Sequence, residues 1–354
     1  MAAVGMSGTI MFIMMSLMIG LSTATRALVS RFIGRGDYDT ARDAAVASLT
    51  VALIISILVG IFGTTLAPDI LHLLGAEGKV LDLGVRYIRI MFIGMMSMAF
   101  SFSVNAILQG AGDSKTPMYI LAVSTGLNIF LDPMLIMGYW IFPKLGVEGA
   151  AIATVSARSM AMIIGLVIIF RGVKSFRIPF SKIAWRPKRL WQILSIGAPA
   201  AVQPALRNLA SLILIRIISG FGAAAVAVLV VIMRLTMFAL LPGMGLGNAN
   251  GAVVGQNLGA GKPDRAKKST RVTVFMIEAI ILVMGTIYFV FSPELISAFN
   301  DAADVVRRTI ESLPDELDDV RVIAEADIDV PGATVHVVPD EFEAEAVRKG
   351  RALE

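Results

Sequence analysis

The chain contains no cysteine and only two histidines among its 354 residues. The lack of cysteine excludes disulfide bonds, thiolate metal sites and a cysteine nucleophile, and two scattered histidines do not supply an imidazole metal site. Charged residues are scarce as well, at 16% of the chain, whereas soluble domains carry roughly a quarter. The composition therefore argues against a disulfide-rich secreted domain, a thiol enzyme and an ordinary soluble domain.

The chain is strongly apolar: 56% of its residues are hydrophobic, and the mean hydropathy is +0.77. A hydrocarbon layer about 30 Å thick is crossed by roughly 20 mostly apolar residues in a helix. Eight runs meet this requirement, at approximately 4–25, 44–67, 84–108, 117–141, 147–170, 190–218, 221–247 and 272–292. We therefore expect an all-α, multi-pass protein of the cell membrane with about eight transmembrane helices.

The distribution of basic residues predicts how these helices are oriented. The loop at 171–189 carries seven lysines and arginines and no acidic residue. Further basic residues follow the first run, occur at Lys115 after the third run and lie within 262–271. Basic loops remain on the cytoplasmic side of a membrane. We expect these four loops to be cytoplasmic, and we read their charge as a sign of topology and not of a nucleic-acid partner.

Part of the sequence is duplicated. Residues 20–41 and 245–266 align without a gap at an offset of 225, with nine identical positions of 22. Six runs separate the copies, so both copies run in the same direction, as in transporters built from parallel repeats. We expect a first lobe with its basic loop at 1–188 and a partial second lobe at 189–299. The glycines at the end of each copy indicate turns that terminate helices.

The last part of the chain differs from the rest. Residues 301–354 hold 15 acidic and 6 basic residues and no apolar run long enough to span a membrane. We expect a short acidic tail at 300–354, α/β or disordered, that is unrelated to the membrane part.

Three further motifs extend the pattern: LQGAGDSKTP at 108–117, LNIFLDPMLI at 127–136 and LGVEGAAIAT at 145–154. Together with the duplicated glycine turns, their order and spacing resemble the multidrug and toxic compound extrusion (MATE) family of secondary transporters, most closely its archaeal and DNA-damage-inducible branch. The resemblance covers about residues 4–300. It implies an incomplete two-lobe helix bundle that lacks the first and the last three of the family's twelve helices.

An acidic residue inside a predicted span is a candidate site, because an ionisable group there costs roughly 2.5–3.5 kcal/mol on insertion scales. Asp132 lies one helical turn after Asn128, and Pro133 frees a backbone carbonyl nearby. Such oxygen ligands suit a hard cation. The resemblance implies that Asn105 and Thr154 complete a cation or proton site with Asp132 and Asn128, with Na⁺ or H⁺ as coupling ion and no other cofactor or metal.

A second group of polar residues lies beside Pro199 and Pro204 in the run at 190–218. Gln203, Arg207 and Asn208 are candidates for substrate contact, and the alternative is a polar lining beside a helix kink.

The resemblance predicts a secondary active multidrug efflux antiporter that exports organic cations or other amphipathic small molecules in exchange for Na⁺ or H⁺. Two alternatives stay open. One is a flippase for lipid-linked oligosaccharides, favoured by Arg158 and Arg207, and the other is a truncated membrane protein without transport. A membrane enzyme is disfavoured, since the sequence has no metalloprotease or nucleophile-elbow motif.

Overall fold

The computed structural model describes residues 2–73, 78–139, 142–172, 176–177, 186–221 and 223–291, so the predicted acidic tail lies outside the described residues. The described part is all-α, as predicted, and has no strand element. Its nine α-helices are α1 (Ala2–Gly34), α2 (Tyr38–Leu73), α3 (Gly78–Ile93), α4 (Met95–Gly110), α5 (Lys115–Met137), α6 (Val147–Arg171), α7 (Pro187–Ile218), α8 (Ala223–Gly259) and α9 (Pro263–Val290).

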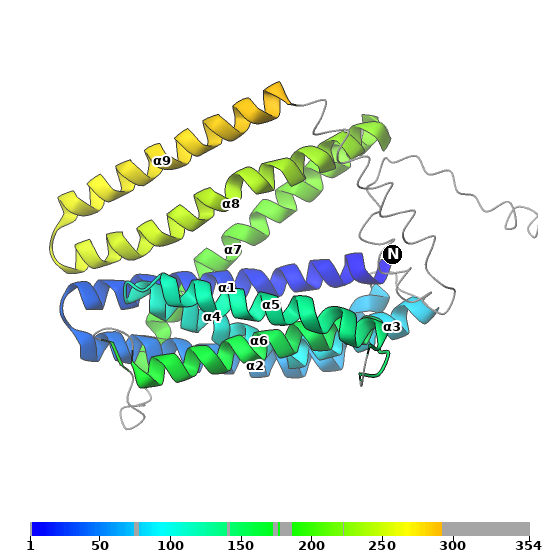
Figure 1. Cartoon of the computed structure of the whole chain (residues 1–354), viewed down its shortest axis with the longest axis horizontal. Helices are drawn as coiled ribbons and strands as arrows, with labels where there is room; N and C mark the ends of the chain where they lie inside the picture. Colours follow the sequence, from blue (N-terminus) through cyan, green and yellow to red (C-terminus); the bar gives the residue numbers. More distant parts are fainter. Residues whose placement is uncertain are drawn as a thin grey trace, which may run out of the picture.

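The helices form two groups (Figure 1). Helices α1 to α6 make one bundle, whose buried core comes mainly from α1, α2, α3 and α4. Helices α7 to α9 lie along one side of that bundle, and α1 packs against both α7 and α8. Helix α1 therefore joins the two groups.

Six of the described helices, α2 and α5 to α9, are long and apolar enough to cross a membrane, and the number is seven if the bent pair α3 and α4 counts as one span. The eighth expected span, at 4–25, falls within α1, where the side chains of the first ten residues are not described. The expected single helix at 84–108 is bent by 42° between α3 and α4. At the bend, the buried Gly94 leaves room for Val155 of α6, because any side chain on Gly94 would overlap Val155.

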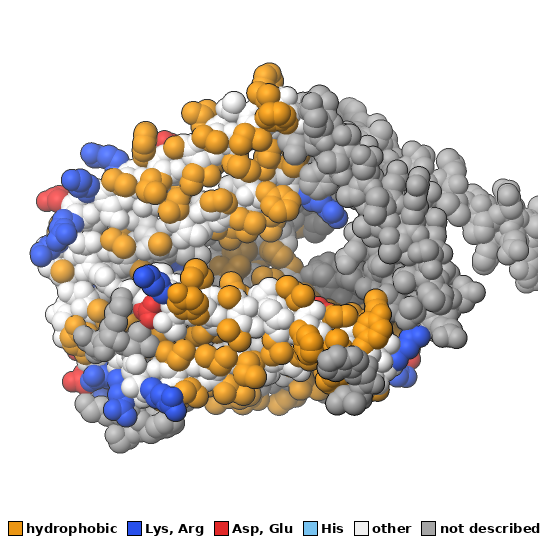
Figure 2. All heavy atoms as spheres, in the orientation of Figure 1, with side chains coloured by type: hydrophobic (Ala, Val, Ile, Leu, Met, Phe, Trp, Pro, Cys, Tyr) orange, Lys and Arg blue, Asp and Glu red, His pale blue; other side chains and the backbone are white. Residues whose placement is uncertain are grey.

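The outer surface is suited to lipid. Large apolar side chains project from α9, with Phe289 85% and Leu282 72% exposed, and Figure 2 shows apolar side chains spread along both helix groups. Lysines and arginines gather mainly at one end, where α1 and α8 terminate (Figure 2). We call this end the basic end. The sequence predicts that it is cytoplasmic.

The duplicated glycine turns have the same geometry. Gly36 and Gly261, which are 225 residues apart, both adopt the left-handed conformation, with φ of 76° and 69°. The next residue in each copy donates its N–H to a carbonyl five residues earlier, from Asp37 to Phe32 and from Lys262 to Asn257. These are the bonds of a Schellman motif, so the prediction of helix-ending turns is confirmed.

Candidate functional site

The two copies of the repeat meet at the basic end, where α1 and α8 cross. A Cβ on Gly34 would overlap the carbonyl of Gln256, and a Cβ on Gly259 would overlap the carbonyl of Arg31. Gly34 corresponds to Gly259, and Arg31 to Gln256, at the offset of 225. The two contacts are thus equivalent, and a pseudo-two-fold axis passes between the helices at this point.

Two polar contacts reinforce this crossing from α4. The guanidinium of Arg26 donates to Gln109 Oε1 at 2.7 Å, and Gln256 Nε2 donates to the Gly110 carbonyl at 3.0 Å. Arg26 is 9% exposed, so its charge is held in a mostly buried position. Sequence reasoning missed these residues, although the matched glycines in the repeat were the signal for a close crossing.

Away from the basic end, α8 leaves the first bundle. A Cβ on Gly245 or on Gly247 would meet no atom within 4 Å, while Gly20, the repeat equivalent of Gly245, packs against Gly197 of α7. Figure 2 shows the face hollowed between the two helix groups toward the end opposite the basic end. Helices α1 and α8 therefore meet closely at the basic end and separate toward the other end.

Asp132 and Asn128 lie on the same face of α5, as the spacing predicts. Asn128 Nδ2 donates to Asp132 Oδ1 at 3.2 Å, and both side chains are half-buried. Pro133 sits inside α5 and has no N–H, so the Ile129 carbonyl receives no helical hydrogen bond from it. A carboxylate, an amide and a freed carbonyl are thus concentrated in one turn.

The packing of α6 on α5 places Thr154 near this turn. Gly149 contacts the Leu135 carbonyl, and Ser124 Oγ donates to the Ala157 carbonyl at 2.9 Å. Thr154 lies between these two contacts along α6, and it is half-buried. Within the described residues, no hydrogen bond joins Thr154 to Asp132.

The structure does not place Asn105 at the same level as Asp132 along the axis of α5. A Cβ on Gly165 would touch both Val104 and Ile120, so Asn105 on α4 lies near the level of Ile120 on α5. Asp132 is farther along α5 by 12 residues, which corresponds to about 18 Å of helix. Asn105 Oδ1 is buried, and in the described part of the chain it has no hydrogen-bond partner.

The three candidate substrate-contact residues on α7 do not all face the same side of the helix. Gly197 and Ala201 face α1, and the same helical stripe continues through the half-buried Asn208. Gln203 and Arg207 are exposed, and each precedes a residue of that stripe, so it points about 100° away from it. Asn208 thus lies toward the helix interface, and the other two lie beside it.

Comparison with known proteins identifies the fold. A family model described as MatE matches residues 1–134 and 199–314, with the second match continuing past the predicted boundary at 299. The probable multidrug resistance protein YoeA of Bacillus subtilis is 31% identical over 303 residues, which cover 84% of this chain and 65% of that protein. This chain belongs to the MatE family, the multidrug and toxic compound extrusion transporters.

Other MatE relatives agree. The probable multidrug resistance protein NorM of Thermotoga maritima is 28% identical, over 89% of this chain and 67% of that protein. A solved structure described as the outward-facing conformation of a multidrug resistance MATE family transporter superposes with a TM-score of 0.78 at 26% identity, over 83% of this chain and 65% of the other. The chain thus spans about two thirds of these relatives. MatE proteins are multi-pass membrane transporters and not enzymes.

Proposed function

We propose that this chain acts in secondary active multidrug efflux, exporting amphipathic organic cations in exchange for Na⁺ or H⁺. The observation that carries the proposal is the crossing of α1 and α8, closed at the basic end and open at the other. With the basic end in the cytoplasm, this arrangement is outward-facing, the conformation that the description of a solved relative names. A transporter of this kind alternates by opening each end in turn.

The coupling ion would bind at Asp132, with Asn128 and Thr154. Asp132 has an amide partner and a freed carbonyl beside it but forms no ion pair within the described residues. A lone carboxylate with neutral oxygen neighbours suits a hard monovalent cation or a proton. Asn105, about 18 Å away along the helix axis, would act separately, at a deeper polar level of the first lobe.

Substrate would lie in the space between the lobes. Gln203 and Arg207 are the exposed polar groups on α7 that would contact it, and the half-buried Asn208 would contact it only when α7 moves relative to α1. The exposed thioethers of Met237 and Met244 on α8 offer a polarizable apolar surface that adapts to varied ligands.

Transport by this chain in proteoliposomes tests the proposal. Vesicles loaded with ethidium are given an inward Na⁺ gradient or an inward H⁺ gradient, and dye efflux is recorded. The Asp132→Asn variant keeps the size of the side chain and its hydrogen bonding to Asn128 but loses the charge. We expect ion-driven efflux to fall at least about tenfold, which corresponds to 1.4 kcal/mol or more of coupling.

The matched control is Asp264→Asn, which removes an exposed carboxylate from the first turn of α9. It should leave efflux within about twofold of the wild-type rate, because a surface charge interacts weakly. Equal ion-driven efflux in wild type and Asp132→Asn would refute the coupling site. Translocation of a lipid-linked oligosaccharide without dye efflux would refute the antiporter and favour the flippase.

A further inference from the structure

A pocket of about 350 Å³ opens at the basic end, between the end of α1 and the start of α7. Its walls include Arg31, Arg35 and Arg189 together with Phe32 and Gln192. The guanidinium carbon of Arg189 lies 4.9 Å from the centroid of the Phe32 ring, and that of Arg35 lies 5.9 Å from it. Two cations therefore gather around one aromatic ring, which attracts each of them through its π face.

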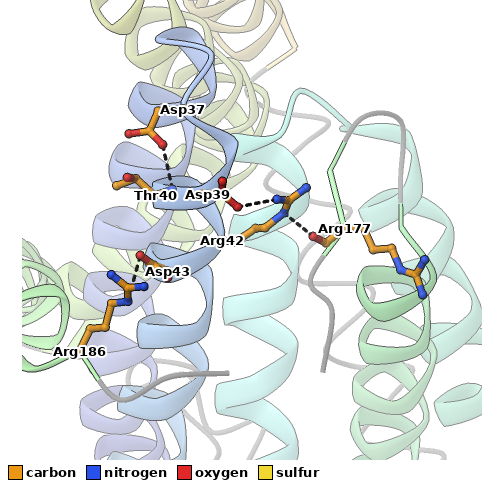
Figure 3. A network of polar contacts seen from close by, with 7 residues as sticks. All are labelled: Asp37, Asp39, Thr40, Arg42, Asp43, Arg177 and Arg186. Carbon is orange, nitrogen blue, oxygen red and sulfur yellow. Dashed lines mark hydrogen bonds and ion pairs between the residues drawn. The ribbon is translucent and has the colours of Figure 1, made fainter. Parts of the chain in front are cut away.

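Two of the nearby carboxylates are paired with other arginines. Asp39 pairs with Arg42 at 2.8 Å, and Asp43 pairs with Arg186 at 3.1 Å. Figure 3 shows both pairs along the first turns of α2. In the part of the chain that the structure describes, Arg31, Arg35 and Arg189 form no ion pair.

Among the described residues of the pocket wall, Asp37 is the one acidic residue; it caps α2, and its charge also interacts with that of Arg189. The Thr40 backbone N–H donates to Asp37 Oδ1 at 3.0 Å (Figure 3). Hydrogen bonds from the Thr40 side chain and backbone hold the pKa of Asp37 below its ordinary value, so its carboxylate is charged at neutral pH. Three guanidinium groups against one carboxylate still leave an excess of positive charge in the pocket.

The guanidinium of Arg189 is also oriented. Its NH1 donates to Gln192 Oε1 at 2.7 Å while the group lies over Phe32. A planar guanidinium fixed in this way has N–H groups left to bind two oxygens of one anion, as in bidentate phosphate recognition.

A residue typical of the membrane–water interface lies close to the pocket in the sequence. Trp191, two residues after Arg189, is 70% exposed at the point where the apolar part of α7 begins. Tryptophan is enriched at the membrane–water interface. Basic side chains at this level, on the side predicted to be cytoplasmic, meet the phosphates of the inner leaflet.

We propose that the pocket formed by Arg31, Arg35 and Arg189 around Phe32 binds a phosphate-bearing anion, either the headgroup of an anionic lipid or free phosphate. The ligand would bridge the first lobe, through α1, and the second, through α7. The backbone of Arg31 and Arg35 also contacts Gly259 of α8, so a bound phosphate would hold the closed basic end together. This last consequence rests on the proposed transport cycle, whereas the binding itself does not.

Lipid binding to the purified full chain tests the site directly. Native mass spectrometry is used to titrate the protein in detergent with phosphatidylglycerol, with phosphatidylcholine as the zwitterionic comparison, and in a separate arm with inorganic phosphate. The test variant is Arg35→Gln with Arg189→Gln. The control is Lys188→Gln with Lys268→Gln, which removes the same charge from exposed positions outside the pocket.

We expect the apparent Kd for phosphatidylglycerol to rise at least about tenfold in the test variant, through the loss of charge-assisted hydrogen bonds, and less than twofold in the control. Arg189→Lys, which keeps the charge but loses the planar fork, should bind with intermediate affinity. Displacement of the lipid by millimolar inorganic phosphate would support the site with free phosphate as its ligand. Equal weakening in test and control variants would overturn the proposal, since diffuse charge would then explain binding. Failure of dye transport leaves this result unaffected.

Discussion

The crossing of α1 and α8 predicts that substitution by alanine lowers the stability of the protein at Gly259 but not at Gly247 of the same helix, α8. In Gly259→Ala the new methyl group would overlap the Arg31 carbonyl oxygen and lie 2.9 Å from its carbon and 3.1 Å from the Arg35 nitrogen. Carbon atoms in good contact are about 3.5–4.0 Å apart, so the helices must separate by about 1 Å. In Gly247→Ala the methyl group meets no atom within 4 Å.

The expected energies follow from these distances. Overpacking at a close contact costs about 1–3 kcal/mol, and replacing glycine by alanine inside a helix returns about 0.5–1 kcal/mol. Gly259→Ala should therefore lower the free energy of unfolding by up to about 2.5 kcal/mol. Gly247→Ala should leave it unchanged or raise it by up to about 1 kcal/mol.

Unfolding in detergent micelles, followed by tryptophan fluorescence against rising dodecyl sulfate, measures both variants. The pseudo-two-fold relation adds a second expectation for Gly34→Ala. Once the methyl group of one variant has separated the helices, the methyl group at the equivalent position is accommodated more easily. The double variant Gly34→Ala with Gly259→Ala should therefore be less destabilised than the sum of the two single variants, by at least about 0.5 kcal/mol. If Gly259→Ala is as stable as Gly247→Ala, or if the two equivalent changes add independently, the symmetric close crossing is refuted.

Two further predictions concern the same end of the molecule. Gln109→Ala should destabilise the protein by about 1.5–3 kcal/mol, because it leaves the buried guanidinium of Arg26 without its acceptor. The double variant Gln109→Ala with Arg26→Leu should return to within about 1 kcal/mol of wild-type stability. If the two substitutions instead lower stability additively in the same dodecyl sulfate titration, this explanation is wrong. For Asp37, the folded pKa is lowered, so its contribution is complete above the unfolded value of about 3.9 and is lost as the pH falls through the folded pKa. Hydrogen-exchange protection of the first turn of α2 should therefore fall below about pH 4 in wild type, and a protection factor with the same pH dependence in Asp37→Asn would show that the cap does not titrate.

Much of the helical layout was predictable because it depends on local properties. The run at 190–218 matches α7 (Pro187–Ile218), and the turns at Gly36 and Gly261 end their helices as expected. The prediction failed where packing intervened. The run at 84–108 has no proline, and its bend at Gly94 depends on the approach of Val155 from α6, which the local sequence does not reveal.

The candidate cation site was predictable to the same extent. The hydrogen bond from Asn128 to Asp132 follows from their spacing within one helix. The grouping of Asn105 with Asn128 and Asp132 came from the resemblance. The position of Asn105 along the axis of α5 depends on how α4 packs lengthwise against α6 and α5. Only the contacts of Gly165 with Val104 and Ile120 reveal that position. The role of Asn105 therefore stays a prediction, separate from the pair on α5.

The sequence by itself determined the membrane class, the helical character, the ends of several helices and the existence of two equivalent copies, because run length, glycine turns and internal identity are properties of the linear chain. The tertiary structure alone decided which glycines meet across the pseudo-two-fold axis and which arginines share a pocket. Arg35 follows α1 and Arg189 lies in α7, which belong to different helix groups, and nothing in their local sequence links them. Each helix can rotate and slide against its neighbours, and only the complete packing fixes the face and the level at which each side chain acts.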